Sequence, residues 1–330
     1  MPAELRRGSR GEAVRDLQAR LTAIGRDLSG DEPGELGPGT EAAVRSFQDA
    51  RGLRVDGVVG RHTWSTLVES GFALGDRFVY AKRPMVRGDD VADLQHRLNA
   101  LGFDAGREDG ILGDETGQAL LEFQRAVGIK ADGICGPGTV AALQRVGTMA
   151  TGSGASVRER ERIRARPRHL DGHRVYVAVT PGLAALGEQV ARGLARAGAD
   201  PTLDASGSDD SLIAGEANQF GADLFLALRP GDQSGCRCAY FAVGRFRSEA
   251  GLGLATAIHE ELAAVIPSDA GVCGKAYAAL RETRMTAVVC EVVPEDDVEA
   301  MRALVTNAAA AATAIVAGIQ RAIEHPPIDE

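Results

Sequence analysis

A chain of 330 residues, 44% of them hydrophobic, is long enough for two or three domains with separate cores. Its formal net charge of -9 argues against general nucleic-acid binding, which needs a basic surface. No long apolar run predicts a membrane span, and no apolar segment follows the N-terminal arginines, so we expect no secretory signal. An odd number of scattered cysteines is typical of reduced thiols, and we expect a cytoplasmic protein. They are Cys135, Cys236, Cys238, Cys273 and Cys290.

Residues 1–72 and 80–147 repeat one pattern. Each copy begins with apolar residues spaced three and four positions apart and followed by glycine, which predicts an amphipathic helix. A second apolar helix, an aspartate-glycine turn and a short third helix follow. Two copies indicate a duplicated three-helix domain and not a solenoid array. The apolar positions of the first two helices are Val14, Leu17, Leu21, Ile24, Ala43, Val44 and Phe47, with Val91, Leu94, Leu98, Leu101, Ala119, Leu120 and Phe123 in the second copy.

This pattern resembles the peptidoglycan-binding domain 1 family, which consists of small three-helix modules on bacterial wall enzymes. The residues that carry the resemblance, beyond the apolar ones, are Gln18, Gly25, Gln48, Gly52, Asp56, Gly57, Gly60 and Thr63, with Gln95, Gly102, Gln124, Gly128, Asp132, Gly133, Gly136 and Thr139 in the second copy. The third helix is expected to start at Thr63 or Thr139. Packing and turns explain most of these residues, so they identify the fold better than a ligand. The resemblance implies binding of peptidoglycan or its precursors.

The composition changes in residues 148–172, which we interpret as a linker. Its first part is small and polar, and we expect a protease to cut first between Gly147 and Ser156. An arginine-rich run follows, consisting of Arg158, Arg160, Arg162, Arg164, Arg166 and Arg168. These arginines suit a phosphate-bearing ligand or an acidic partner, whereas the interleaved Glu159 and Glu161 favour a solvated linker helix. Both interpretations stay open.

Residues 173–325 alternate between strand and helix patterns. Short runs rich in β-branched residues predict strands at 175–179, 222–228 and 286–293, and longer segments predict helices at 186–198, 251–266 and 298–323. This order predicts an α/β domain with a twisted, mostly parallel sheet flanked by helices. Functional residues of such sheets lie at the carboxyl ends of the strands. Cys236 and Cys238 would share one face of a strand, and we interpret them as packed residues, not a metal or redox pair.

The strand ends resemble the zinc-dependent N-acetylmuramoyl-L-alanine amidases of the amidase 3 family, which cut the bond between muramic acid and the stem peptide. The family's first strand ends in aspartate-proline-glycine-histidine, whereas this chain has Thr180-Pro181-Gly182-Leu183. The next family strand ends in a histidine, replaced here by Arg229. The last motif keeps Glu291, which the resemblance implies is the family's catalytic carboxylate. The loop that carries the middle ligand is shortened, and Glu188 is expected to be an ordinary helix residue.

These departures predict a degenerate zinc site. Catalytic zinc needs three protein ligands and an open position for water. Leu183 has no donor atom, and Arg229 would place a permanent cation at the metal position. We therefore expect no metal, no other cofactor and no catalytic residue, with Arg229 paired to Glu291 or facing a carboxylate or phosphate of a ligand or partner. None of the histidines restores the site: His62, His96, His169, His173, His259 and His325.

The whole arrangement resembles actinobacterial pseudo-amidases of the CwlM type. The resemblance implies a cytoplasmic regulator of peptidoglycan synthesis linked to UDP-N-acetylglucosamine enolpyruvyl transferase (MurA). One departure is the end of the sequence, HPPIDE, which follows the last expected helix without a threonine-bearing tail for phosphorylation. Two alternatives stay open. One is an active zinc amidase that cleaves the muramic acid to stem-peptide bond, and the other is a wall-anchored binding protein.

Overall fold

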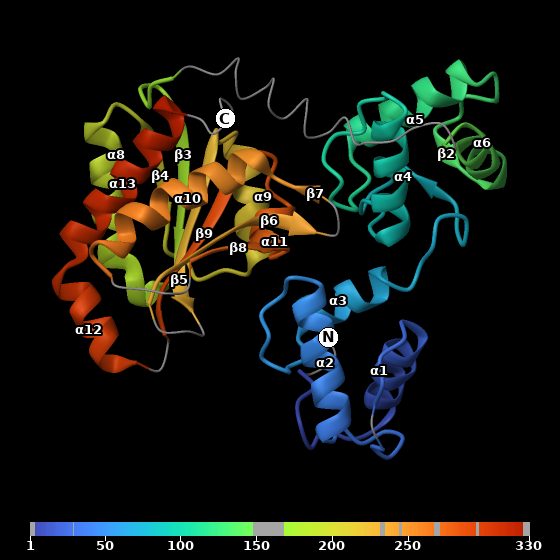
Figure 1. The fold of residues 1–330 in the computed structure, drawn as a ribbon, viewed down its shortest axis with the longest axis horizontal. Coiled ribbons are helices and arrows are strands. Elements are labelled where there is room, and N and C mark those ends of the chain that lie inside the picture. Colours follow the sequence, from blue (N-terminus) through green and yellow to red (C-terminus); the bar gives the residue numbers. More distant parts are fainter. Residues whose placement is uncertain are drawn as a thin grey trace. The chain divides into compact units, whose positions relative to one another are not determined.

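The computed structural model forms two compact units, Met1–Arg158 and Glu159–Glu330 (Figure 1). The structure describes residues 4–28, 30–147, 168–231, 235–243, 246–266, 271–294 and 297–325. Most of the expected linker, with its cleavage site and all its arginines except the exposed Arg168, lies outside the described residues. Near the C-terminal end of the expected linker, Leu170 is 4% exposed and packs into the apolar core of the α/β unit. This core therefore begins before residue 173.

The first repeat is the expected three-helix domain. Its helices are α1 (Glu12–Ala23), α2 (Pro38–Ala50) and α3 (Arg61–Glu69). The predicted apolar stripe is buried, with Val14, Leu17 and Leu21 fully inside the core and Ile24 at its margin. The first helix ends as predicted, because Gly25 adopts a left-handed φ of 76° that a side chain disfavours.

The second repeat has the same three helices, α4 (Asp89–Ala100), α5 (Asp114–Ala126) and α6 (Pro137–Gly147). In both repeats the third helix begins two residues before the threonine at which the sequence predicts its start. The second repeat also contains a short ribbon that the sequence did not predict. In it, β1 (Val79–Tyr80) pairs antiparallel with β2 (Ile134–Cys135).

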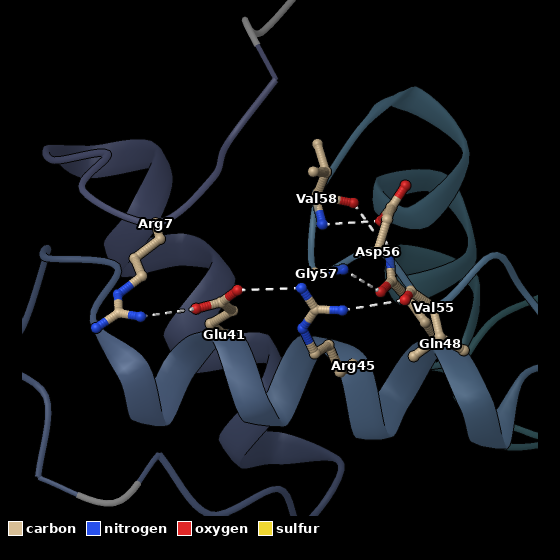
Figure 2. A network of polar contacts seen from close by, with 8 residues as sticks. All are labelled: Arg7, Glu41, Arg45, Gln48, Val55, Asp56, Gly57 and Val58. Atoms are coloured by element: carbon tan, nitrogen blue, oxygen red, sulfur yellow. Dashed lines mark hydrogen bonds and ion pairs between the residues drawn. The ribbon is translucent and has the colours of Figure 1, made fainter. Parts of the chain in front are cut away.

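Buried glutamines hold the loops of both repeats, and Gln48 shows how (Figure 2). The N–H of Gly57 donates to Oε1 of Gln48 at 2.8 Å, where the left-handed φ of 73° at Gly57 forms the predicted turn. Nε2 of Gln48 donates to the Val58 carbonyl at 3.0 Å and to the Thr63 hydroxyl at 3.3 Å. One side chain therefore joins α2, the turn and the first turn of α3.

Three further glutamines make the same set of contacts. In each case Oε1 accepts from a glycine N–H, and Nε2 donates to the hydroxyl of a threonine six residues after that glycine. The sets are Gln18, Gly34 and Thr40; Gln95, Gly110 and Thr116; and Gln124, Gly133 and Thr139. The polar residues that carry the family resemblance are therefore structural, since buried amides need partners.

The α/β unit contains a mixed sheet with the strand order β4-β3-β5-β9-β6-β7, and β8 also pairs with β6. The neighbours β4, β3, β5 and β9 are parallel, as predicted, while β6 runs antiparallel to β9. The bounds are β3 (Arg174–Val179), β4 (Asp200–Asp204), β5 (Leu224–Gly231), β6 (Arg237–Val243), β7 (Phe246–Arg247), β8 (Val272–Lys275) and β9 (Thr286–Pro294).

Helices pack on both faces of this sheet (Figure 1). The main apolar core lies under α8 (Ala184–Arg196), α10 (Glu249–Ala263), α12 (Val298–Thr306) and α13 (Ala308–Glu324). The other face contacts α9 (Asp210–Phe220) and the short α11 (Ala278–Arg281). In the described part of the chain no single helix has the length and apolarity of a membrane span; α12 and α13 meet that test only as a pair, bent by 76°.

Candidate functional site

The predicted site residues lie where parallel strands end. The chain leaves β3 through a turn of 3-10 helix, Pro181–Leu183, while Arg229 and Glu291 lie near the ends of β5 and β9. Arg229 and Glu291 are direct partners in the parallel pairing of these strands. On the other side of β9, Arg237 of β6 is the partner of Glu291 in the antiparallel pairing. The glutamate therefore lies between two arginines from neighbouring strands.

Both carboxylate oxygens of Glu291 accept hydrogen bonds. Oε1 accepts from Nη2 of Arg229 at 3.2 Å and from the hydroxyl of Tyr277 at 3.0 Å. Oε2 accepts from Nη1 of Arg237 at 3.3 Å. Glu291 is 7% exposed and Arg237 8%, so these bonds are largely shielded from water. The pairing of Arg229 with Glu291 that the sequence suggested is present, and Arg237 and Tyr277 extend it to a network.

Arg229 has two further neighbours. Nη1 lies 3.4 Å from a carboxylate oxygen of Asp210, and the guanidinium lies 4.0 Å from the ring centre of Tyr277. Burial alone would lower the pKa of Arg229, but the negative charges of Asp210 and Glu291 outweigh burial and raise it. Burial and the nearby charge of Glu291 also raise the pKa of Tyr277. The arginine thus keeps its charge and the tyrosine keeps the proton that it donates to Glu291.

Two helices fix the network from the second face of the sheet. Asp210 is the first residue of α9, whose N-terminus is capped by the side chain of Asp209. Tyr277 occupies the position before α11. These helices are joined by Asn218, whose amide donates to the Glu282 carbonyl at 2.8 Å. The side chains around Glu291 are therefore held by three strands and two helices.

Leu183 lies outside this network. It is 2% exposed and belongs to the apolar core under α8, α10, α12 and α13. Glu188 is an exposed residue of α8 and pairs with Arg192 at 3.5 Å, one turn further along, as expected for an ordinary helix residue. The structure thus brings Arg229 and Glu291 together but gives Leu183 a packing role.

The donor set does not fit the zinc ion of the amidase 3 family. Leu183 offers a hydrocarbon side chain, Arg229 offers a cation, and both oxygens of Glu291 already accept from arginine or tyrosine. A dication would also meet the two permanent positive charges of Arg229 and Arg237. Across the described residues, no group of three or more histidine, cysteine, aspartate or glutamate side chains could hold a metal ion.

Two of the histidines and three of the cysteines have the following places in the fold. His96 pairs with Glu108 in the second repeat at 3.0 Å, and His259 lies within α10. Cys236 and Cys238 are both fully buried in the same apolar core, as interpreted from their spacing. Cys238 lies opposite Cys290 on β9, with their sulfur atoms 3.4 Å apart.

Three members of the network were not found from the sequence. Arg237 stands between Cys236 and Cys238. Because side chains alternate along a strand, two buried cysteines put Arg237 on the opposite face, which indicates a polar partner there. Its partner strand, however, cannot be read from that pattern. Asp210 and Tyr277 lie at helix starts, where their residue types alone indicate caps, not contacts with a distant strand.

Known proteins resemble this chain over its repeats and over most of its length. A family model described as "Putative peptidoglycan binding domain" matches residues 10–67 and 87–143. The N-acetylmuramoyl-L-alanine amidase CwlM of Mycobacterium tuberculosis is 34% identical over 330 aligned residues, covering 87% of this chain and 81% of the relative. A probable N-acetylmuramoyl-L-alanine amidase of Bacillus licheniformis is 35% identical over 155 residues, covering 42% of this chain and 44% of the relative. Among solved structures, the amidase Ami1 of Mycobacterium smegmatis has a TM-score of 0.40 at 15% identity, covering 46% of this chain and 96% of that chain.

Proposed function

Because this chain belongs to the family of the mycobacterial N-acetylmuramoyl-L-alanine amidase CwlM, we propose that it is a non-catalytic member that regulates peptidoglycan synthesis. It is an amidase-like protein with two peptidoglycan-binding modules. In the proposal these modules bind peptidoglycan or its precursors, and the α/β unit acts as a rigid platform and not as a hydrolase. The site of action is the cytoplasm.

The state of Glu291 supports the absence of catalysis. A general base needs an acceptor within reach of a water molecule, and Arg229, Tyr277 and Arg237 take three of the about four acceptor positions of this carboxylate. A general base by itself contributes about 10² to 10⁴ in rate. Amide hydrolysis needs far more, and the family obtains it from a metal ion for which these residues are unsuited.

The partner that we propose is MurA, the enolpyruvyl transferase at the start of precursor synthesis. The support is the resemblance to CwlM-type regulators. The chain keeps an amidase-like fold, but its residues do not fit the zinc ion of the family. A role in which the chain regulates MurA by binding it agrees with this combination. In this proposal, binding of wall material by the repeats and binding of MurA by the same chain would couple precursor supply to demand.

Metal analysis tests the non-catalytic part of the proposal. The purified chain, dialysed against zinc and then against metal-free buffer, should retain far less than stoichiometric zinc. The matched variant carries Leu183→His and Arg229→His, and it should also fail to hold zinc because the middle ligand is still missing. Stoichiometric zinc in the parent chain would contradict the proposal.

A binding assay tests the regulatory part. Immobilised full-length chain should capture MurA from the same organism, and addition of the chain should change the rate of the enolpyruvyl transfer. A surface variant in the first repeat, Arg15→Ala, serves as a control because it removes only a solvent-exposed ion pair with Glu12. Absence of both capture and a rate change would remove MurA as the partner while leaving the non-catalytic assignment intact.

A further inference from the structure

The ribbon of the second repeat exposes a row of apolar side chains. Val79 and Cys135, which are opposite each other, are buried and face the core of the repeat. The next pair, Tyr80 and Ile134, is 39% and 36% exposed. Because successive side chains of a strand alternate between its faces, Phe78 points to the same side as Tyr80. Phe78 is 62% exposed, so three large apolar side chains share the outer face of the ribbon.

The ring of Phe78 packs against the backbone of a glycine, Gly136. A Cβ atom at position 136 would lie only 2.8 Å from a ring carbon of Phe78, so the ring lies directly against the Gly136 backbone. Contact with the backbone leaves one side of the ring to solvent. A side chain at this position would push the ring away from the ribbon. Glycine at position 136 therefore allows the Phe78 ring to pack on the ribbon backbone with its other side exposed.

Positive charges lie beside the aromatic rings. The ammonium group of Lys82 is 5.6 Å from the ring centre of Tyr80, within the range of a cation–π contact. Lys82 and the adjacent Arg83 are both exposed. This end of the ribbon thus combines apolar ring faces with cations, in a chain whose net charge is negative.

The first repeat shows that the fold does not require these residues. There the corresponding bridge joins Leu5 to Val59, and the positions equivalent to Phe78 and Tyr80 are Glu4 and Arg6. Gly60 takes the place of Gly136, and a Cβ atom at position 60 would lie 3.8 Å from a carboxylate oxygen of Glu4. Both Glu4 and Arg6 are exposed. The repeat therefore folds with polar side chains here, and the aromatic pair of the second repeat needs another explanation.

We propose that Phe78, Tyr80 and Ile134, with Lys82, form the surface through which the second repeat binds the sugar rings of peptidoglycan or its amino-sugar precursors. The axial C–H groups of a pyranose carry partial positive charge and pack on the negative face of an aromatic ring. Lys82 and Arg83 complement the free carboxylates of the stem peptide. The inference rests on the proposed function, because it assumes that the repeats bind wall material, and it assigns that binding to one face.

The size of the surface favours a sugar over a protein. Large aromatic side chains bury about 150–250 Å² when fully covered. Here two aromatic residues and one isoleucine are only partly exposed, which is well below the roughly 800 Å² per partner of a stable protein interface. An area of this size matches one or two pyranose rings.

The test compares matched variants of the two repeats in the full-length chain. Binding is measured by sedimentation with purified sacculi and by calorimetry with N-acetylglucosamine tetramer. Phe78→Ala and Tyr80→Ala should each weaken binding by about tenfold, whereas Tyr80→Phe, which keeps the ring, should remain within about twofold of the parent. Lys82→Ala should weaken binding to sacculi but not to the uncharged tetramer. The matched controls Glu4→Ala and Arg6→Ala should bind like the parent, and all variants should melt at the parent temperature because these side chains are exposed.

Each other result has a distinct meaning. A double variant carries both Phe78→Ala and Tyr80→Ala. If this double variant binds sacculi as well as the parent does, the assignment to this face is wrong and the proposed function stands. If the parent binds neither sacculi nor the tetramer, the proposed binding of wall material fails, and the inference fails with it. If the double variant retains glycan binding but loses MurA, the ribbon is a protein-docking surface and the glycan assignment is overturned.

Discussion

Glu291 has a partner on each of its carboxylate oxygens. A carboxylate that is 7% exposed must be paired, and here two arginines and a tyrosine hydroxyl donate to it. With Asp210 included, two positive and two negative charges face each other. Such a network adds little net stability compared with an apolar core, but loss of the central Glu291 takes away the anion that both arginines share.

Substitutions within the network should therefore lower the free energy of unfolding by different amounts. Glu291→Gln leaves Arg229 and Arg237 facing each other without a central anion, and we predict a loss of about 3–5 kcal/mol in the free energy of unfolding. Arg229→Ala should cost only about 2 kcal/mol, because Glu291 keeps its bonds to Arg237 and Tyr277. Denaturant unfolding of the two variants measures the order. A larger loss for Arg229→Ala, or no loss for either variant, would contradict the structural role of the network.

The thiols should be unreactive in the native protein. Burial, helped by nearby carboxylates, raises the pKa of Cys135 to about 12, and the contact with Cys290 followed by burial raises the pKa of Cys238. Cys273 is only partly buried, although burial raises its pKa also. At a pH of about 8 we predict that a charged disulfide reagent modifies Cys273 slowly and the other thiols only after unfolding. Mass spectrometry locates the labels, and rapid native labelling of Cys135 or Cys238 would show that these cores open.

At this scale the sequence was informative about only part of the site. Arg229 and Glu291 could be paired in advance because the resemblance to the amidase 3 family implies that both stand at positions around the family's metal site. Arg237 could not be added, because the pairing of β6 with β9 is antiparallel and joins segments separated by α10, α11 and two short strands. The position of Leu183 in the apolar core was also hidden, since a ligand position in a motif does not specify where a replacing side chain points.

The elements of the repeats were predictable because their local signals agree. Apolar spacing, glycine stops and aspartate-glycine turns all indicate the same helices, and buried glutamines join these parts. The α/β unit was harder. β4 carries Pro201 and polar residues that resemble a loop, and it forms a strand at the edge of the sheet, where proline is tolerated. The ribbon of β1 and β2 is too short to produce an alternating pattern.

The glutamine contacts can be tested in the first repeat. Gln48→Ala removes the acceptor of the Gly57 N–H and the donor to the Val58 carbonyl, so we predict a loss of about 2–3 kcal/mol in the free energy of unfolding. Arg45→Ala is the control, because Arg45 makes only exposed contacts, an ion pair with Glu41 and a hydrogen bond to the Val55 carbonyl (Figure 2). Its loss should cost below about 1 kcal/mol. Calorimetry of the isolated repeats measures both. Equal, small losses would mean that water replaces the glutamine.

The start of α2 should make the first repeat sensitive to acid. Burial opposes ionisation of Asp31, but hydrogen bonds from the Thr40 and Gly39 N–H groups lower its pKa from the usual 3.8. A group with a lowered folded pKa stabilises the protein fully above 3.8, and this stability is lost as the pH falls below that value. Asp31→Asn should therefore lower the melting temperature at neutral pH, by an amount equivalent to about 1 kcal/mol, and much less at pH of about 2. A difference that does not change with pH would contradict the role of the charge.

The whole molecule is built from separate cores. One apolar core contains residues between Leu170 and Ile323, and the two repeats have their own cores within residues 5–67 and 74–143. Within the described residues the repeats and the α/β unit therefore share no apolar core.

Separate cores predict separate folding. Fragments 1–147 and 168–330 should each be soluble and unfold cooperatively, and their calorimetric transitions should together reproduce those of the full chain. Failure of fragment 168–330 to fold alone, while the full chain is stable, would mean that the repeats supply part of the α/β core.

The most direct test of the central claim is an assay for release of stem peptide from purified sacculi by the full-length chain in the presence of added zinc. Because a network of Arg229, Arg237 and Tyr277 occupies the only retained family carboxylate, Glu291, we predict no release above the buffer control while an active amidase digests the same sacculi. Release of stem peptide that is lost in the Glu291→Gln variant would show that the chain is an active amidase and would contradict the account.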